Sequence, residues 1–158
     1  MIDREATYQA LADRIAGALG AVSLNGSPPF GSWTVTRTFK DFDDSTLSQP
    51  ACVVVATEQR PVASGPGNLH AWQLDAHALV YFKARDPSVY VDTMVNEVID
   101  AIDGSLNAGI QEPDSTGGPH TTLGGLAVRA SIEGTIRIFQ GLPNSQTVVI
   151  IPITMLVA

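Results

Sequence analysis

Cations and cysteines are scarce in this chain of 158 residues. Nine lysines and arginines stand against 16 acidic residues, which gives a formal net charge of -7 at pH 7. Proteins that grip nucleic acid or anionic lipid need clustered Lys and Arg, and the nine cations form no cluster. The charge balance therefore argues against a nucleic-acid-binding protein and against a membrane-surface protein.

A single cysteine excludes an internal disulfide. Cys52 lies in the apolar run ACVVVA, where we expect a buried thiol that packs like a small hydrophobic residue. The opening MIDREATYQA has no apolar signal-peptide core, so the sequence predicts a protein made and folded in a cytoplasm. The closing TVVIIPITMLVA is shorter than the roughly 20 residues of a membrane-spanning helix and contains Pro152, so we expect no membrane span.

No pattern typical of catalysis or metal binding is found. His70, His77 and His120 lie far apart and lack the i, i+4 spacing of zinc enzymes. The acidic DFDD at 41–44 lacks the glycine and glutamate of a calcium loop, and STGGPHTTLGG lacks the Lys-Ser/Thr end of a phosphate-binding loop. We expect no catalytic residue, no metal site and no cofactor, and a protein that is not an enzyme.

Two segments have the apolar periodicity of amphipathic helices. In the first, Asp3 is the expected N-cap and Gly20 the expected end. The second follows Asp86 as N-cap and Pro87 at its first helical position, and its apolar stripe ends at Leu106.

Five segments have the apolar pattern of β-strands, at 33–40, 51–57, 71–83, 126–139 and 147–158. The fourth is long for one straight strand, so a bend or bulge is expected at Gly134. The order of elements shows no regular βαβ alternation. The sequence therefore predicts a single α+β domain over 1–158, with a curved, mainly antiparallel sheet of about five strands packed against two helices.

The closing segment has two apolar faces, because its odd-numbered and its even-numbered residues are both apolar. Pro152 has no N–H to give to a sheet, which confines the segment to an edge strand or a bulge. Two interpretations stay open. The segment is an internal strand with a bulge at Pro152, or it is an edge strand whose even-numbered face contacts another copy. The contact residues would be Val148, Ile150, Pro152 and Leu156.

Charged residues mark further candidate contacts. Arg129, Glu133 and Arg137 share one face of their strand, as a solvated ladder of charges or as an ion-pair seam between subunits. Long polar loops are expected at 58–68 and 107–120, and such loops often bind partners. The candidate residues there for contact with a partner or with a bore are Glu58, Gln59, Arg60, Glu112, Asp114 and His120.

The order and spacing of these pieces resemble the tail terminator, or minor tail, proteins of long-tailed bacteriophages and prophages. The segments that carry the resemblance cover nearly the full length: DREATYQALADRI, TVTRTFKDFDD, QPACVVVATEQ, WQLDAHALVYFKARDP, VIDAID, TTLGG, ASIEGTIRI and QTVVIIPITMLV. The resemblance implies an α+β, non-enzymatic virion protein that forms a hexameric ring at the head-proximal end of the tail tube.

Such a ring stops polymerisation of the tail tube protein and joins the tail to the head through a connector or neck protein. The resemblance also implies that DNA passes through the bore without specific binding, and that the ring is assembled in the host cytoplasm. The first alternative is a head-completion or neck connector protein. A small-ligand-binding domain or an enzyme, with a pocket between sheet and helices, is the second.

Overall fold

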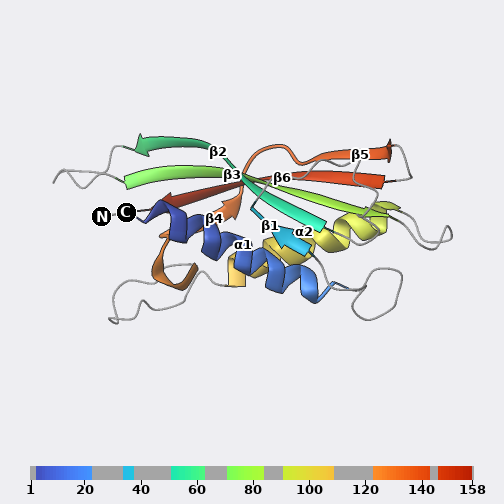
Figure 1. The fold of residues 1–158 in the computed structure, drawn as a ribbon, viewed down its shortest axis with the longest axis horizontal. Coiled ribbons are helices and arrows are strands. Elements are labelled where there is room, and N and C mark those ends of the chain that lie inside the picture. Colours follow the sequence, from blue (N-terminus) through green and yellow to red (C-terminus); the bar gives the residue numbers. More distant parts are fainter. Residues whose placement is uncertain are drawn as a thin grey trace.

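The computed structural model describes residues 3–22, 34–37, 51–62, 71–83, 91–108, 123–142 and 146–157. Within this part of the chain, helices α1 (Arg4–Gly20) and α2 (Val91–Ala108) lie on one face of a six-stranded sheet (Figure 1). This is the α+β fold with a curved, mainly antiparallel sheet that the sequence predicts, with one strand more than expected.

The strands are β1 (Thr34–Thr36), β2 (Ala51–Val62), β3 (Ala71–Lys83), β4 (Arg129–Ile132), β5 (Arg137–Leu142) and β6 (Gln146–Val157). Their order in the sheet is β1-β2-β3-β6, and both β4 and β5 then pair with the far side of β6. β1 is parallel to β2, and the other pairs are antiparallel. A short 3-10 turn, η3 (Leu123–Gly125), precedes β4.

Helix α1 begins and ends where the sequence predicts. Asp3 Oδ1 accepts a hydrogen bond from the N–H of Ala6 at 2.9 Å, which satisfies one of the free N–H groups of the first turn. The helix ends at Gly20. For α2, the expected N-cap Asp86 and the following Pro87 lie outside the described residues. Neither α1 nor α2 combines the length and the apolar character that a bilayer span requires.

The main core lies between the helices and the sheet. Every second residue of β3 and β6 points toward the helices, as the two-residue period of a strand requires. On β6 these are the odd-numbered residues Val149, Ile151, Ile153, Met155 and Val157, each at most 3% exposed. The face of the sheet away from the helices, called the outer face below, holds a smaller buried cluster of Val53, Tyr81 and Val148.

β6 is an interior strand with an irregularity at Pro152, and the edge-strand interpretation is therefore wrong. β3 pairs with β6 along the whole length of β6, and β4 and β5 pair with the other side of β6. The carbonyl of Pro152 accepts from the N–H of Glu133 at 3.1 Å. Because the N–H and C=O of one strand residue point to the same side, the missing N–H of Pro152 faces this irregular stretch between β4 and β5. Gly134, at φ 113°, interrupts the long strand as predicted.

Candidate assembly surface

The titratable groups of the described residues do not gather into a metal site. No group of three or more His, Cys, Asp or Glu side chains in this part of the chain is placed to hold a metal. His77 lies half-buried in the middle of β3, opposite Val55 and Pro152. Cys52 is fully buried, and desolvation raises the pKa of its thiol to about 12, so the thiol is protonated at neutral pH.

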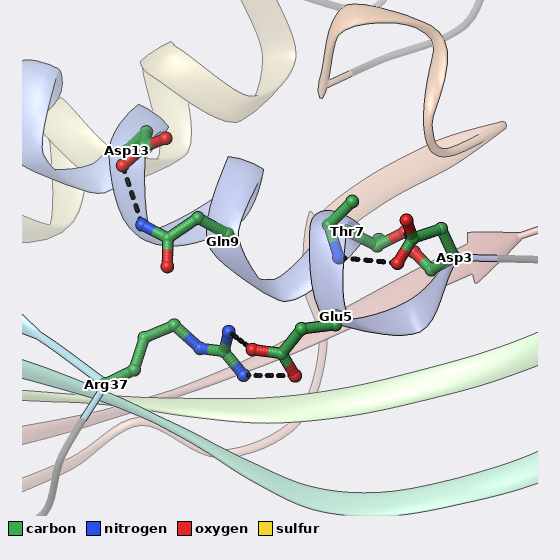
Figure 2. A network of polar contacts seen from close by, with 7 residues as sticks. Asp3, Glu5, Thr7, Gln9, Asp13 and Arg37 are labelled. Carbon is green, nitrogen blue, oxygen red and sulfur yellow. Dashed lines mark hydrogen bonds and ion pairs between the residues drawn. The ribbon is translucent and has the colours of Figure 1, made fainter.

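Arg37, directly after β1, ties that edge of the sheet to α1. Its guanidinium forms an ion pair with Glu5, with a second contact from Nη2 to Oε2 at 3.4 Å (Figure 2). Arg37 Cζ also lies 5.6 Å from the centre of the Tyr8 ring, within the range of a cation–π contact. On the same helix, Gln9 donates to Asp13 at 3.0 Å. These contacts occupy the exposed side of α1 near β1, and they hold structure together.

The outer face carries a chain of side-chain hydrogen bonds across three strands. Arg60 donates to Gln73 Oε1 at 2.8 Å, and Gln73 Nε2 donates to Asp75 Oδ1 at 3.1 Å. Thr154 Oγ1 donates to the same Asp75 oxygen at 2.9 Å. Because Asp75 is half-buried and Thr154 is buried, these bonds satisfy polar groups that would otherwise lose hydration. Only Arg60, at the start of the chain of bonds, is exposed.

A depression of about 290 Å³ lies beside this network. Its lining includes Glu58, Asp75, His77 and Glu133. Two of the three carboxylates have partners within the chain: Asp75 accepts the bonds described above, and Glu133 accepts from Ser131 at 3.1 Å. The depression is thus lined mainly by side chains that already serve the fold.

One lateral edge of the sheet is polar. β1 pairs with β2 only along 51–53, and no described strand pairs with β2 on that side along 54–62. Residues 56–61 are exposed. Glu58, Gln59 and Arg60 therefore lie in a strand, and the expectation of a loop beginning at Glu58 is wrong. The exposed end of an edge strand needs no apolar face and can contain a proline such as Pro61. The sequence of this part of β2 therefore resembles that of a loop.

The opposite edge, formed by β4 and β5, is apolar as well as charged. The large apolar side chains that are most exposed in the described part of the chain are Val128, Ile138 and Phe139, each at 45%, and all three lie along this edge. Ile138 and Phe139 are neighbours in β5, so they project from opposite faces of the sheet. A strand that exposes large apolar groups on both faces is a ready site for pairing with another chain.

The predicted charge ladder lies on the same edge. Arg129, Glu133 and Arg137 are all exposed, and Arg129 Nη2 lies 3.2 Å from Glu133 Oε1. Two of the three predicted charges, those of Arg129 and Glu133, are therefore paired with each other within one chain. Because both partners are exposed, this ion pair adds little to stability.

The predicted contact residues of β6 are less accessible than those of β5. Val148 is buried with Val53 and Tyr81, while Ile150, Pro152 and Leu156 are half-buried. Sequence reasoning did not single out the exposed Ile138 and Phe139 as candidate contact residues. The available signal was the adjacent apolar pair itself, which breaks the alternation of apolar and polar residues within β5. The remaining candidates, Glu112, Asp114 and His120, lie outside the described residues.

The described residues thus define an α+β protein with an open sheet, whose most distinctive accessible features are two unlike edges. No protein-family model matches the chain, and no curated protein matches it.

Proposed function

We propose that this chain is a structural protein that assembles with copies of itself. The observation that carries the proposal is the exposure of Val128, Ile138 and Phe139 along the β4–β5 edge. Proteins that remain monomeric shield such edges with charge, proline or a covering segment, because an unpaired strand with apolar side chains recruits other strands. Self-association covers this edge.

We further propose that the assembly is a hexameric ring that acts as a phage tail terminator. The support is the order of segments along nearly the whole chain, which resembles that family. The ring would cap the head-proximal end of the tail tube, stop growth of the tube protein and meet the connector or neck protein. Its place is the virion tail, after assembly in the host cytoplasm, and it needs no cofactor and no catalytic residue.

The acidic character of the chain is compatible with this role. A net charge of -7 on each copy gives a ring whose summed potential repels nucleic acid. DNA that crosses the bore would pass without specific binding, because specific binding needs clustered cations to hold phosphates.

A tube-growth assay tests the function. The tail tube subunit encoded with this chain would be polymerised with and without it, and the products examined by electron microscopy. We expect tubes that stop growing and carry a ring at one end. Unchanged tube growth without rings at tube ends contradicts the terminator function. Particles made without the protein separate the nearest alternative, since overlong or unjoined tails indicate a terminator and heads that leak DNA indicate a neck connector.

A further inference from the structure

We infer that copies of this chain join head to tail, with the β4–β5 edge of one copy paired against β2 of the next along 54–62, where no described strand of its own chain pairs with that side. The occupant of each edge is therefore a second copy of the chain. The inference rests on the proposed function to the extent that it specifies the contact by which the ring closes.

Strand directions permit this arrangement. β2 is antiparallel to β3, β3 to β6, and β6 to both β4 and β5. Within one copy, β5 therefore runs opposite to β2. A neighbour related by rotation, with its helices on the same side of the sheet, presents its own β2 antiparallel to β5. Antiparallel pairing then continues the sheet from one copy into the next by strand addition.

The spacing of charges on the two edges matches. Glu133 bonds to Pro152 and Arg137 lies opposite Ile150, so these two residues are separated by the rise of only two residues of β6. Glu133 and Arg137 are four residues apart in sequence, and the irregular stretch at Gly134 accounts for the two additional residues. Glu58 and Arg60 on β2 are likewise two residues apart.

The order of charges selects the antiparallel direction. The register places Glu58 opposite Asp75 and Arg60 opposite Gln73, on the outer face, which is also the face of Arg137. In an antiparallel pair, Glu58 of one copy faces Arg137 of its neighbour, and Arg60 faces Glu133. A parallel pair would bring like charges together at both positions, which is destabilising for directly opposed residues.

The same register covers exposed apolar surface. β2 has an irregularity between Ala56 and Glu58, so the outer-face residue before Glu58 is Val55. With Glu58 opposite Arg137, Val55 comes beside Phe139 of the neighbouring copy. Val55 is half-buried and Phe139 is 45% exposed, so this contact removes apolar area from water on both sides.

Cysteine cross-linking in the full chain tests the contact. Under mild oxidation, the combined variant Glu58→Cys and Arg137→Cys is expected to give a ladder of covalent multimers on a non-reducing gel. Each single variant is expected to stay uncross-linked. Cys52 is 0% exposed and does not interfere. The matched control combines Glu58→Cys with Arg129→Cys, because Arg129 lies opposite Leu156, about 20 Å along β6 from Ile150. This control is expected to give no ladder.

Charge reversal gives an independent readout. Glu58→Arg or Arg137→Glu alone is expected to raise the concentration needed for half-assembly by about fivefold, measured by sedimentation velocity. The two reversals together are expected to restore assembly toward that of the unmodified protein. Both positions are exposed, and circular dichroism would confirm that each variant is folded.

Each contrary result has a distinct meaning. Covalent dimers from Glu58→Cys alone, or from Arg137→Cys alone, overturn the head-to-tail arrangement in favour of an edge paired with itself. Absence of a ladder from the combined variant overturns the edge contact, and if rings still form and stop tube growth, the proposed function stands. A ladder from a protein that leaves tube growth unchanged supports the edge contact and contradicts the function in tails.

Discussion

Gly134 lies against Pro152: a Cβ atom added to Gly134 would come within 3.2 Å of Pro152 Cγ. Gly134 also has φ 113°, a backbone conformation that residues with a side chain rarely adopt. Regular strand pairing is thus interrupted at Gly134, between β4 and β5, opposite Pro152, the residue of β6 that has no N–H to donate. The two residues together explain how an interior strand of this sheet accommodates a proline.

Gly134→Ala should lower the free energy of unfolding by about 1–3 kcal/mol, because alanine is strained at this φ and crowds Pro152. Urea denaturation would measure the change. The matched control is Gly17→Ala, in the interior of α1, where an added Cβ meets no atom within 4 Å. That variant should be stabilised by about 0.5–1 kcal/mol, since alanine is the better helix former. Equal stability of Gly134→Ala and the unmodified protein would contradict the conclusion that a glycine is required at position 134, beside Pro152.

The two faces of β6 should respond differently to a charge. Ile151 is 0% exposed between sheet and helices, so Ile151→Asp buries an unpaired carboxylate and should abolish cooperative folding. Ile150 is half-buried on the outer face, opposite Arg137, and Ile150→Asp should remain folded. Circular dichroism and thermal melting distinguish the two outcomes. Unfolding of both variants to the same extent would show that the outer face is as essential to the core as the helix-facing side.

The sequence predicts features set by near neighbours better than features set by distant ones. The cap at Asp3, the interruption at Gly134 and the buried side chain of Ile151 follow from local chemistry and from the period of a strand. The partners of β6 are distant in sequence, so the pattern around Pro152 fits an edge or an interior strand equally well. Only the pairing with β3, β4 and β5 decides between them.

The candidate surface shows the same division. Glu58 and Arg60 were expected in a loop, because polar residues beside Pro61 look alike in a loop and in a free edge strand. Arg137 is a candidate contact residue because of its charge, and the structure places it exposed in β5. The sequence does not single out Phe139, since the exposure of Phe139 depends on which strand ends the sheet. The exposure of a residue at a sheet edge depends on the order of the strands in the sheet. That order is not predicted by the local pattern of a single sequence.

Alkaline pH should destabilise the protein through Cys52. Burial raises the pKa of this thiol from 9.0 to about 12. Below pH 9 the thiol is neutral in both states, whereas between pH 9 and 12 it ionises only after unfolding. The free energy of unfolding should therefore fall by up to about 1.4 kcal/mol per pH unit above pH 9.

Urea midpoints measured from pH 8 to pH 10 would show this slope, and Cys52→Ala should reduce it. Tyr81, whose pKa is also raised by burial, adds a loss in the same direction that begins near pH 10 and is removed in Tyr81→Phe. A slope that is the same with and without Cys52 would mean that the thiol is hydrated in the folded protein.

Removal of the α1 cap should cost more than removal of a nearby ion pair. Asp3→Ala leaves the N–H of Ala6 without its side-chain acceptor and should lower the free energy of unfolding by about 1 kcal/mol. Glu5→Gln breaks the pair with Arg37 but should cost less, about 0.2–1 kcal/mol, because Glu5 is 81% exposed. Chemical denaturation of both variants ranks the two effects. If Glu5→Gln lowers the free energy of unfolding more than Asp3→Ala does, the ion pair between Arg37 and Glu5 contributes more to stability than the helix cap.

The irregularity at Ala56–Glu58 lies in β2, and Gly134 lies in the stretch between β4 and β5, so each lies on one of the edges through which copies would meet. Such irregularities bend the chain and sharpen its twist, so each one sets the angle at which its edge leaves the subunit. In a head-to-tail assembly these two angles add at every junction, and a circle closes only when the junctions sum to a full turn. The number of copies in the ring would then depend on these two irregularities, and removing one of them would change how many copies close the circle.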